Sequence, residues 1–253
     1  MNIPDCPLPT QPTDCITLAH GGGGRMTNRL IESIFYPAFA NQWLEQAHDG
    51  ATLPMPHSRL AFTTDSFVVS PLFFPGGNIG DLAVNGTVND LLCCGATSLY
   101  LSAAFILEEG LPLDTLRQVV QAMREAASRA GVSIVTGDTK VVEHGKCDGL
   151  YINTSGIGLV PGNIEIGLHR VQKGDAVIVT GPIGNHGVSI LSTREGLNFE
   201  TTIESDTAAL THIVSNLLAG VPDVHMLRDP TRGGLASTLN EIAEGAGVTI
   251  TLD

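Results

Sequence analysis

Apolar and polar residues alternate along the first half of the chain in patterns typical of strands and helices. The run 59–69 is rich in β-branched and aromatic residues and predicts a strand that Asp65 interrupts. Apolar residues recur at helical spacing through 113–130, which predicts a helix with Asp114 as its N-cap and Gly131 at its C-terminal end. The regularity of this second pattern indicates a scaffold helix.

The segment 78–95 predicts another helix, and its two sides differ in character. One side is apolar, whereas polar residues at three- and four-residue spacing line the other. The polar set is Asn78, Asp81, Asn85 and Asn89. The uncharged run 91–107 contains glycine, threonine and serines and is bounded by acids, so we interpret it as a helix end leading into a buried strand rather than a membrane span.

Segment 132–160 predicts two strands that flank a polar loop centred on Gly137–Lys140. The pattern restarts after residue 170, which predicts a domain boundary there. We expect a lead-in without structure at 1–15, a first domain at 16–168 and a second domain at 169–253. In the second domain we expect strands at 176–180 and 248–252 and helices from 188, at 206–218 and at 235–244.

Composition excludes several classes of function. The formal net charge of -13 leaves no broad basic face, so nucleic acid and anionic membranes are not expected partners. The N-terminal segment lacks the basic and apolar regions of a secretory signal. Five cysteines without CxxC spacing fit neither a disulfide framework nor a zinc site, which favours a reducing, cytoplasmic location.

Acidic, glycine-rich and basic features together predict a metal and phosphate site. Asp65, Asp90 and Asp138 come from separate segments, and carboxylate oxygens are ligands that Mg²⁺ prefers. The run Gly21–Gly24 could lay backbone amides along phosphate oxygens, and Lys140 could add a positive charge. Each feature alone is as well explained by a turn, a strand end or a solvated side chain. The chain has neither a Walker A loop nor a dinucleotide fingerprint.

The same residues carry a resemblance to a known family. The matching segments, in chain order, are LAHGGGGRMTNRLIESIF, TTDSFVVSPLFFPGGNIGDLAVNGTVNDLL, FILEEGLP, IVTGDTKVVEHGK, INTSGIG and LRDPTRGGLASTLNEIA. They resemble the HypE family of hydrogenase maturation proteins, within the superfamily of aminoimidazole ribonucleotide synthetase, selenophosphate synthetase and thiamine-monophosphate kinase. The resemblance runs from about residue 16 to the last residue.

The resemblance implies a mixed α/β (α+β), two-domain PurM-like fold whose first domain forms a shared β-barrel in a homodimer. It implies an ATP- and Mg²⁺-dependent carbamoyl dehydratase that converts a protein-bound S-carboxamide to thiocyanate, the source of the cyanide ligands of [NiFe]-hydrogenase. The implied partners are the carbamoyltransferase HypF and the HypC–HypD scaffold complex. ATP would phosphorylate the amide oxygen, which turns a poor leaving group into a good one.

Carried onto this sequence, the resemblance makes Asp65, Asp90 and Asp138 the metal-binding acids. Lys140 and the glycine run would contact phosphates. The full set expected at the nucleotide is Gly21, Gly22, Gly23, Gly24, Asn89, Lys140, Asp229, Thr231, Arg232, Gly233 and Gly234. For the last five residues, an ion pair between Arg232 and Asp229 and a helix cap made by the two glycines remain open as structural roles.

The family carries its carbamoyl group on a C-terminal cysteine, and none of the five cysteines here matches it by position. We therefore assign no catalytic residue and expect a C-terminally truncated, incomplete second domain with an uncovered apolar face. Two alternatives remain open. One is a nucleotide-binding or docking remnant without turnover, and the other is an enzyme like selenophosphate synthetase, although Cys15 lacks the lysine that such an enzyme needs nearby.

Overall fold

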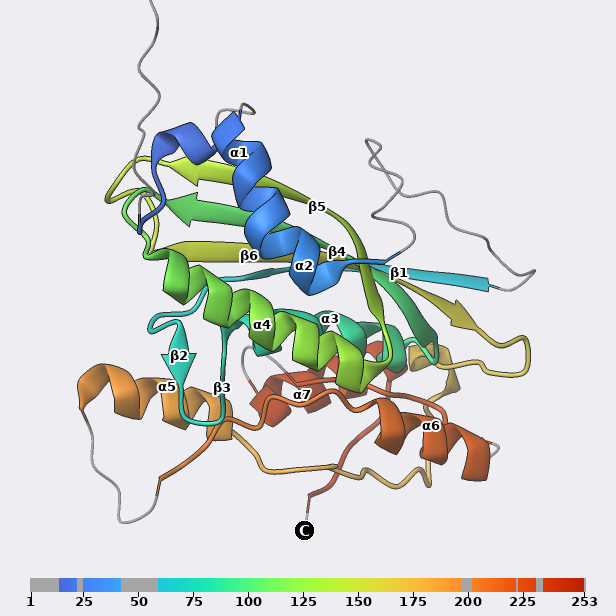
Figure 1. Ribbon diagram of the computed structural model, residues 1–253. Helices are drawn as coiled ribbons and strands as arrows, with labels where there is room; N and C mark the ends of the chain where they lie inside the picture. The colour runs from blue at the N-terminus through green and yellow to red at the C-terminus, as the bar shows by residue number, and fades with distance from the viewer. Residues whose placement is uncertain are drawn as a thin grey trace, which may run out of the picture.

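Four strands form the sheet that organises the first half of the chain (Figure 1). The computed structural model describes residues 14–21, 25–41, 59–196, 202–221, 223–230 and 234–252. The strand order is β1-β6-β4-β5, with β6 antiparallel to both neighbours and β4 parallel to β5. The strands are β1 (Arg59–Phe67), β4 (Thr97–Glu108), β5 (Ser133–Val142) and β6 (Leu150–Val160), and a small hairpin joins β2 (Phe73–Phe74) to β3 (Gly77–Asn78).

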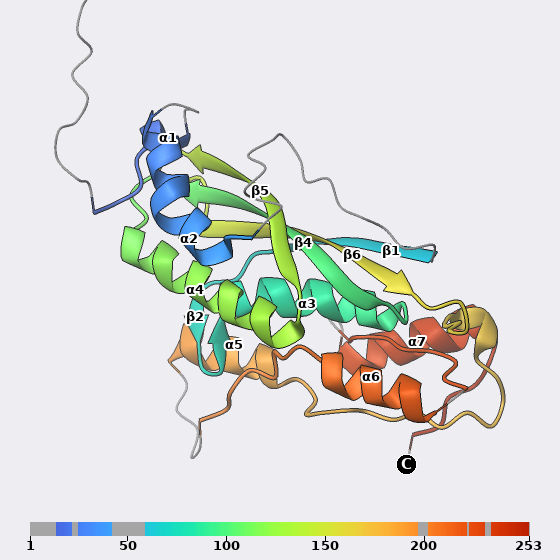
Figure 2. The same cartoon turned by 45° about the vertical axis from the view of Figure 1, so that its right-hand side comes forward.

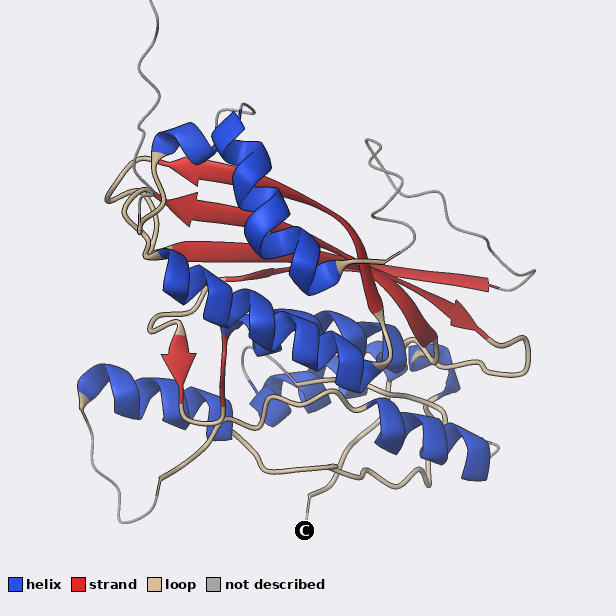
Figure 3. Ribbon diagram, viewed as in Figure 1, coloured by secondary structure: helices blue, strands red, loops and turns tan. Residues whose placement is uncertain are grey.

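The helices of the first half cover one face of this sheet and form the main core with it (Figure 3). Phe35 illustrates the packing, since its ring centroid lies 4.9 Å from that of Phe105 on β4. The opposite face is open, and Phe62 there is 65% exposed. The covering helices are η1 (Leu18–Gly21), α1 (Arg25–Leu30), η2 (Ile31–Phe35), α2 (Tyr36–Phe39), α3 (Ile79–Cys93) and α4 (Leu113–Ala130).

Helix α3 begins with a capping box and packs against the sheet at a glycine contact. The Asn78 side chain accepts a hydrogen bond from the Gly80 amide, and Asp81 accepts one from the Asn78 amide in return. Gly156 on β6 allows the close approach, because a Cβ there would lie 2.9 Å from both Leu91 and Thr87 of α3. A larger residue at 156 would therefore push the helix off the sheet.

The second half of the chain lies against the side of α3 and α4 that faces away from the sheet (Figures 1 and 2). An irregular segment, residues 202–210, runs along α3. The expected strands at 176–180 and 248–252 are wrong for the described chain, since both segments lack regular secondary structure. The described residues supply no neighbouring strand to pair with them, and Ile178 is 79% exposed. The helical elements are η4 (Leu168–Arg170), α5 (Asn185–Glu195), α6 (Thr211–Gly220) and α7 (Gly234–Ala246).

Three local predictions also need correction. Asp65 lies within β1 and does not interrupt it. Gly137–Lys140 form part of β5 rather than a loop, because they continue the parallel pairing with β4. Pro112, not Asp114, is the N-cap of α4, although that helix spans the predicted residues and Gly131 ends it with φ of 72°.

Replacing Gly156 by alanine should destabilise the fold by about 1–3 kcal/mol, because the new methyl group would overpack the contact between α3 and the sheet. Chemical denaturation of both proteins would measure this loss. Gly162→Ala is a matched control, since a Cβ at that position meets no atom within 4 Å. Equal stability of the Gly156 variant and the wild type would contradict the proposed role of this close approach.

Candidate functional site

The sheet places the predicted metal-binding acids on two different faces. Asp65 pairs with Thr154 of β6, and Thr154 pairs with Ala103 of β4, which pairs with Gly137 of β5. The side chain of Thr154 donates to the carbonyl of Ala83 in α3, so this row of residues faces the helices. Asp138 follows Gly137 and therefore points to the open face. A single chain does not bring Asp138 to Asp65.

Asp90 lies near the C-terminal end of α3, opposite β1. The hydroxyl of Thr63 on β1 donates a hydrogen bond of 2.8 Å to Asp90 Oδ2. Thr63 and Asp65 are two positions apart on the strand, so both face α3. Burial raises the pKa of Asp90, the Thr63 hydrogen bond lowers it, and the nearby charge of Asp65 raises it further.

Asp229 joins these two acids from the second half of the chain. Its pKa rises from 3.8 to about 6, first because the carboxyl is buried and then because Asp90 repels its negative charge. Asp65 contributes in the same direction, and Arg228 opposes it. We call Asp65, Asp90 and Asp229 the acid cluster. The sequence prediction placed Asp229 in the wall of a nucleotide cleft and did not group it with the acids.

The acid cluster has the chemistry of a site for a hard divalent cation. Its carboxylates repel one another, and a bound cation would relieve this repulsion. Within the described residues, no three acidic, histidine or cysteine side chains lie close enough to hold a metal by themselves. The donor type therefore fits Mg²⁺, while the three-acid ligand set of Asp65, Asp90 and Asp138 stays a prediction.

Asp138 and Lys140 form a separate pair of charges on the open face. They lie two positions apart on β5, beside Ala104 and Ile106 of β4. Both residues are exposed, and within the described part of the chain neither side chain has a hydrogen bond or an ion pair. Among the described residues, nothing neutralises these two charges.

Asn89, predicted at the nucleotide, uses both ends of its amide to hold the second half of the chain. Its Nδ2 donates to the carbonyl of Ala208 at 2.9 Å, and its Oδ1 accepts from the amide of Leu210 at 3.0 Å. One turn earlier, Asn85 donates to Thr207 at 3.2 Å. The polar side of α3 thus binds segment 202–210, and a nucleotide role for Asn89 stays a prediction.

The glycine-rich segments of the predicted site are only partly described. Gly21 ends η1, and Gly234 begins α7 with φ of 60°. Gly22–Gly24 and Thr231–Gly233 lie outside the described residues. Beside Gly21, the buried His20 accepts a hydrogen bond from the Thr17 amide through Nδ1 at 2.9 Å.

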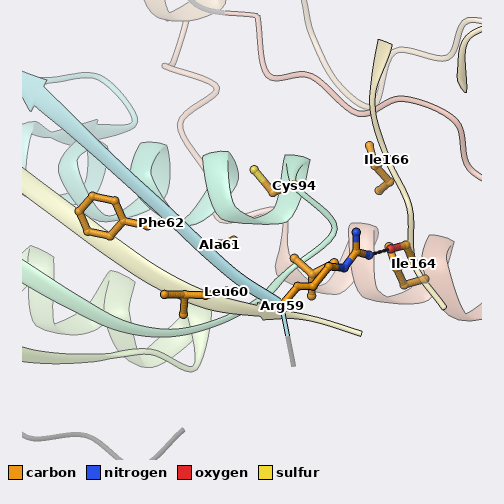
Figure 4. Close-up of a pocket in the computed structure, with 8 residues that line it drawn as sticks. Arg59, Leu60, Ala61, Phe62, Cys94, Ile164 and Ile166 are labelled. Atoms are coloured by element: carbon orange, nitrogen blue, oxygen red, sulfur yellow. Dashed lines mark hydrogen bonds between the residues drawn. The ribbon is translucent and has the colours of Figure 1, made fainter. Parts of the chain in front are cut away.

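Two further features near α3, the Cys93 thiol and a pocket beside β1, do not indicate a catalytic site. Burial raises the pKa of the Cys93 thiol to about 12, so this thiol stays protonated and is a poor nucleophile at neutral pH. A pocket of about 330 Å³ lies beside the end of β1 (Figure 4). Its polar side chain, Arg59, donates to the carbonyl of Ile164. The lining residues are Arg59, Leu60, Ala61, Phe62, Cys94, Val160, Ile164 and Ile166, and none belongs to the acid cluster.

The structure has a sheet that helices cover on one face, with acidic residues close to α3. Comparison with known families identifies the class of protein that has this architecture. Residues 47–160 match the model of the AIR synthase related protein N-terminal domain, and residues 172–253 match that of the C-terminal domain. The chain therefore belongs to the AIR synthase related family, with a mixed α/β, PurM-like fold.

Within that family, the chain belongs to the HypE carbamoyl dehydratases. It is 55% identical over 239 residues to Carbamoyl dehydratase HypE of Cupriavidus necator, covering 94% of this chain and 68% of the relative. A crystal structure of the hydrogenase maturation protein HypE in complex with ATP matches with a TM-score of 0.88 and 52% identity over 90% of this chain and 68% of that one. HypE in a crystal structure of a HypE–HypF complex matches with a TM-score of 0.73 and 48% identity over 86% and 70%.

The raised pKa of Asp229 predicts a pH-dependent cost in stability. Between pH 3.8 and about 6 the folded protein holds a proton that the unfolded chain releases, so the free energy of unfolding falls as pH rises through this range. Asp229→Asn should remove this cost and stabilise the metal-free protein at pH 8 by about 2–3 kcal/mol. Below pH 4 the difference should vanish.

Urea denaturation from pH 4 to pH 8 in the presence of a chelator would measure this effect. Asp148→Asn, at an exposed position, is a matched control for the loss of one carboxylate. A constant difference between Asp229→Asn and wild type at all pH values would show that the acid cluster does not perturb Asp229.

Proposed function

We propose that this chain is a hydrogenase maturation factor of the carbamoyl dehydratase type, which uses ATP to convert a protein-bound S-carboxamide to a thiocyanate. The observation that carries the proposal is the acid cluster against α3, in a fold that matches a relative crystallised in complex with ATP. A divalent cation, which can bridge carboxylates to the phosphate groups of a nucleotide, is the natural occupant of a site where partly buried carboxylates repel one another.

In the proposed reaction, the carboxamide oxygen attacks the γ-phosphorus of ATP, ADP leaves, and the carboxamide nitrogen releases one of its two protons. The phosphorylated intermediate then loses phosphate and the remaining nitrogen-bound proton, which leaves a carbon–nitrogen triple bond. A bound Mg²⁺ would supply charge neutralisation at the phosphate oxygens. Asp65 and Asp90 would hold that ion together with the phosphate oxygens of the nucleotide, with Asp229 beside them.

The group that carries the carboxamide in this proposal is the C-terminal cysteine of the family. The chain spans 67–72% of the length of the HypE relatives that it matches. Cys93, with its pKa of about 12, is not a substitute. The catalytic nucleophile is therefore not assigned to any of the five cysteines.

We further propose that a second copy of the chain completes the nucleotide site. Asp138 and Lys140 point to the open face, opposite the acid cluster, and their side chains have no partner within the described chain. Exposed Phe62 and Leu60 lie on the same face and would be buried by association of two copies. In this arrangement, the acid cluster of one chain and the Asp138–Lys140 pair of the other would contact the same phosphates.

The partners and location proposed for this chain follow its relatives. One of the matched crystal structures is that of a HypE–HypF complex, and we propose the carbamoyltransferase HypF as a partner here, with the HypC–HypD complex as the acceptor of the cyano group. In the described parts of the chain, no helix has both the length and the apolar character needed to cross a membrane. We propose a cytoplasmic location.

Calorimetry should detect ATP binding that requires Mg²⁺ and that weakens at least about tenfold in Asp138→Asn, since the variant loses one charged contact with the metal–phosphate group. Equimolar mixing of Asp138→Asn and Asp90→Asn chains tests whether the site is shared. If two chains contribute to each site, about a quarter of the wild-type binding sites should return, all of them in mixed dimers. Absence of nucleotide binding by the wild type would refute the proposed function, whereas binding without recovery on mixing would refute only the shared site.

Sedimentation at micromolar concentration should show a dimer, and Phe62→Lys should convert it to a monomer because a charge would replace the largest exposed apolar group on the open face. Val221→Lys provides a control of the same kind, since Val221 is 44% exposed but lies in the second half of the chain. Dimers that persist in Phe62→Lys would place the interface elsewhere.

A further inference from the structure

Thr63 is a polar residue of β1 to which the sequence prediction gave no role, and it makes one specific contact in the acid cluster. Its hydroxyl donates to Asp90 Oδ2 at 2.8 Å. No other hydrogen bond of the Thr63 hydroxyl or of the Asp90 carboxylate occurs within the described residues. The contact therefore fixes one carboxylate oxygen, while Oδ1 of Asp90 makes no hydrogen bond to any residue that the structure describes.

The packing of α3 against β1 places the Thr63 hydroxyl next to the Asp90 carboxylate. Thr63 pairs with Gly156 on β6, the same glycine that lets α3 lie close to the sheet. Gly86 acts similarly from the helix side, since a Cβ there would lie 2.9 Å from the ring of Phe67 on β1. The short separation between α3 and β1 is what allows a side chain as short as threonine to reach Asp90.

We propose that Thr63 is a positioning residue that orients Asp90 for binding of a divalent cation. This inference rests on the function proposed above. An aspartate side chain at the end of a helix can adopt several rotamers, and a hydrogen bond to one oxygen selects the rotamer that presents the other. Thr63 does not touch the cation or the nucleotide itself. Thr63 would instead reduce the free-energy cost of ordering the Asp90 side chain as a metal ligand.

The decisive comparison is between Thr63→Val and Thr63→Ser. Valine keeps the branched shape and removes the hydroxyl, whereas serine keeps the hydroxyl and removes the methyl group. Titration of Mn²⁺, followed by electron paramagnetic resonance in the presence of ATP, measures cation affinity without depending on turnover. We expect about tenfold weaker Mn²⁺ binding in Thr63→Val, from loss of a hydrogen bond to a charged group, and near wild-type binding in Thr63→Ser.

Two further measurements separate positioning from general damage. Thr97→Val, at an exposed strand position on β4, should bind Mn²⁺ as the wild type does. Unfolding in chelator should show that Thr63→Val remains folded under the conditions of the titration. Unchanged Mn²⁺ affinity in Thr63→Val, or equal loss in Thr63→Ser, overturns the positioning role. Absence of ATP-dependent Mn²⁺ binding in the wild type overturns the proposed function and this inference together.

Discussion

The close seating of α3 on the sheet is the constraint on which the rest of the structure depends. Gly156 permits it from the strand side and Gly86 from the helix side. Because the helix lies so near β1, Asp90 comes within reach of Thr63 and within electrostatic range of Asp65. The opposite, polar side of the same helix binds the second half of the chain. One helix thus determines both the geometry of the acids and the position of Asp229 relative to them.

The acid cluster costs stability in the absence of a ligand. Burial and mutual repulsion act in the same direction on Asp90 and Asp229, and Arg228 offsets only part of that effect. Such an arrangement is expected at a site that binds a cation, since the same repulsion that destabilises the free protein strengthens binding of the ion. Asp138 and Lys140 lie on the open face, away from the acid cluster of their own chain. In the proposed dimer, they would therefore act at the cation and nucleotide bound by the other chain.

Sequence patterns predicted the long elements of the first half well, because those elements form their own core. The periodicity of 113–130 identified α4, and the pattern change after residue 91 identified the passage from α3 to β4. The prediction of a loop at Gly137–Lys140 was wrong. Glycine usually marks a turn, but Gly137 lies within β5 and pairs with Ala103 of β4. In the second half, apolar runs at 176–180 and 248–252 met no partner strand within the described chain.

The sequence prediction grouped Asp65 and Asp90 with Asp138, whereas the structure places Asp229 beside the first two. Spacing within one strand places Thr63 and Asp65 on a common face, and this signal was available without a structure. The opposite orientation of Asp138 depends on the pairing register across four strands, which no local pattern encodes. Similarly, the contribution of Asp229 arises from a contact between residues more than a hundred positions apart.

The two hydrogen bonds of Asn89 have a consequence for motion. Because one amide group holds the carbonyl of Ala208 and the amide of Leu210 at the same time, the segment cannot slide along α3 while keeping either bond. Movement of this segment along α3 would therefore break both bonds together. Asn89 is the immediate neighbour of Asp90, so the same helix turn that holds the second half of the chain also carries an acid of the cluster.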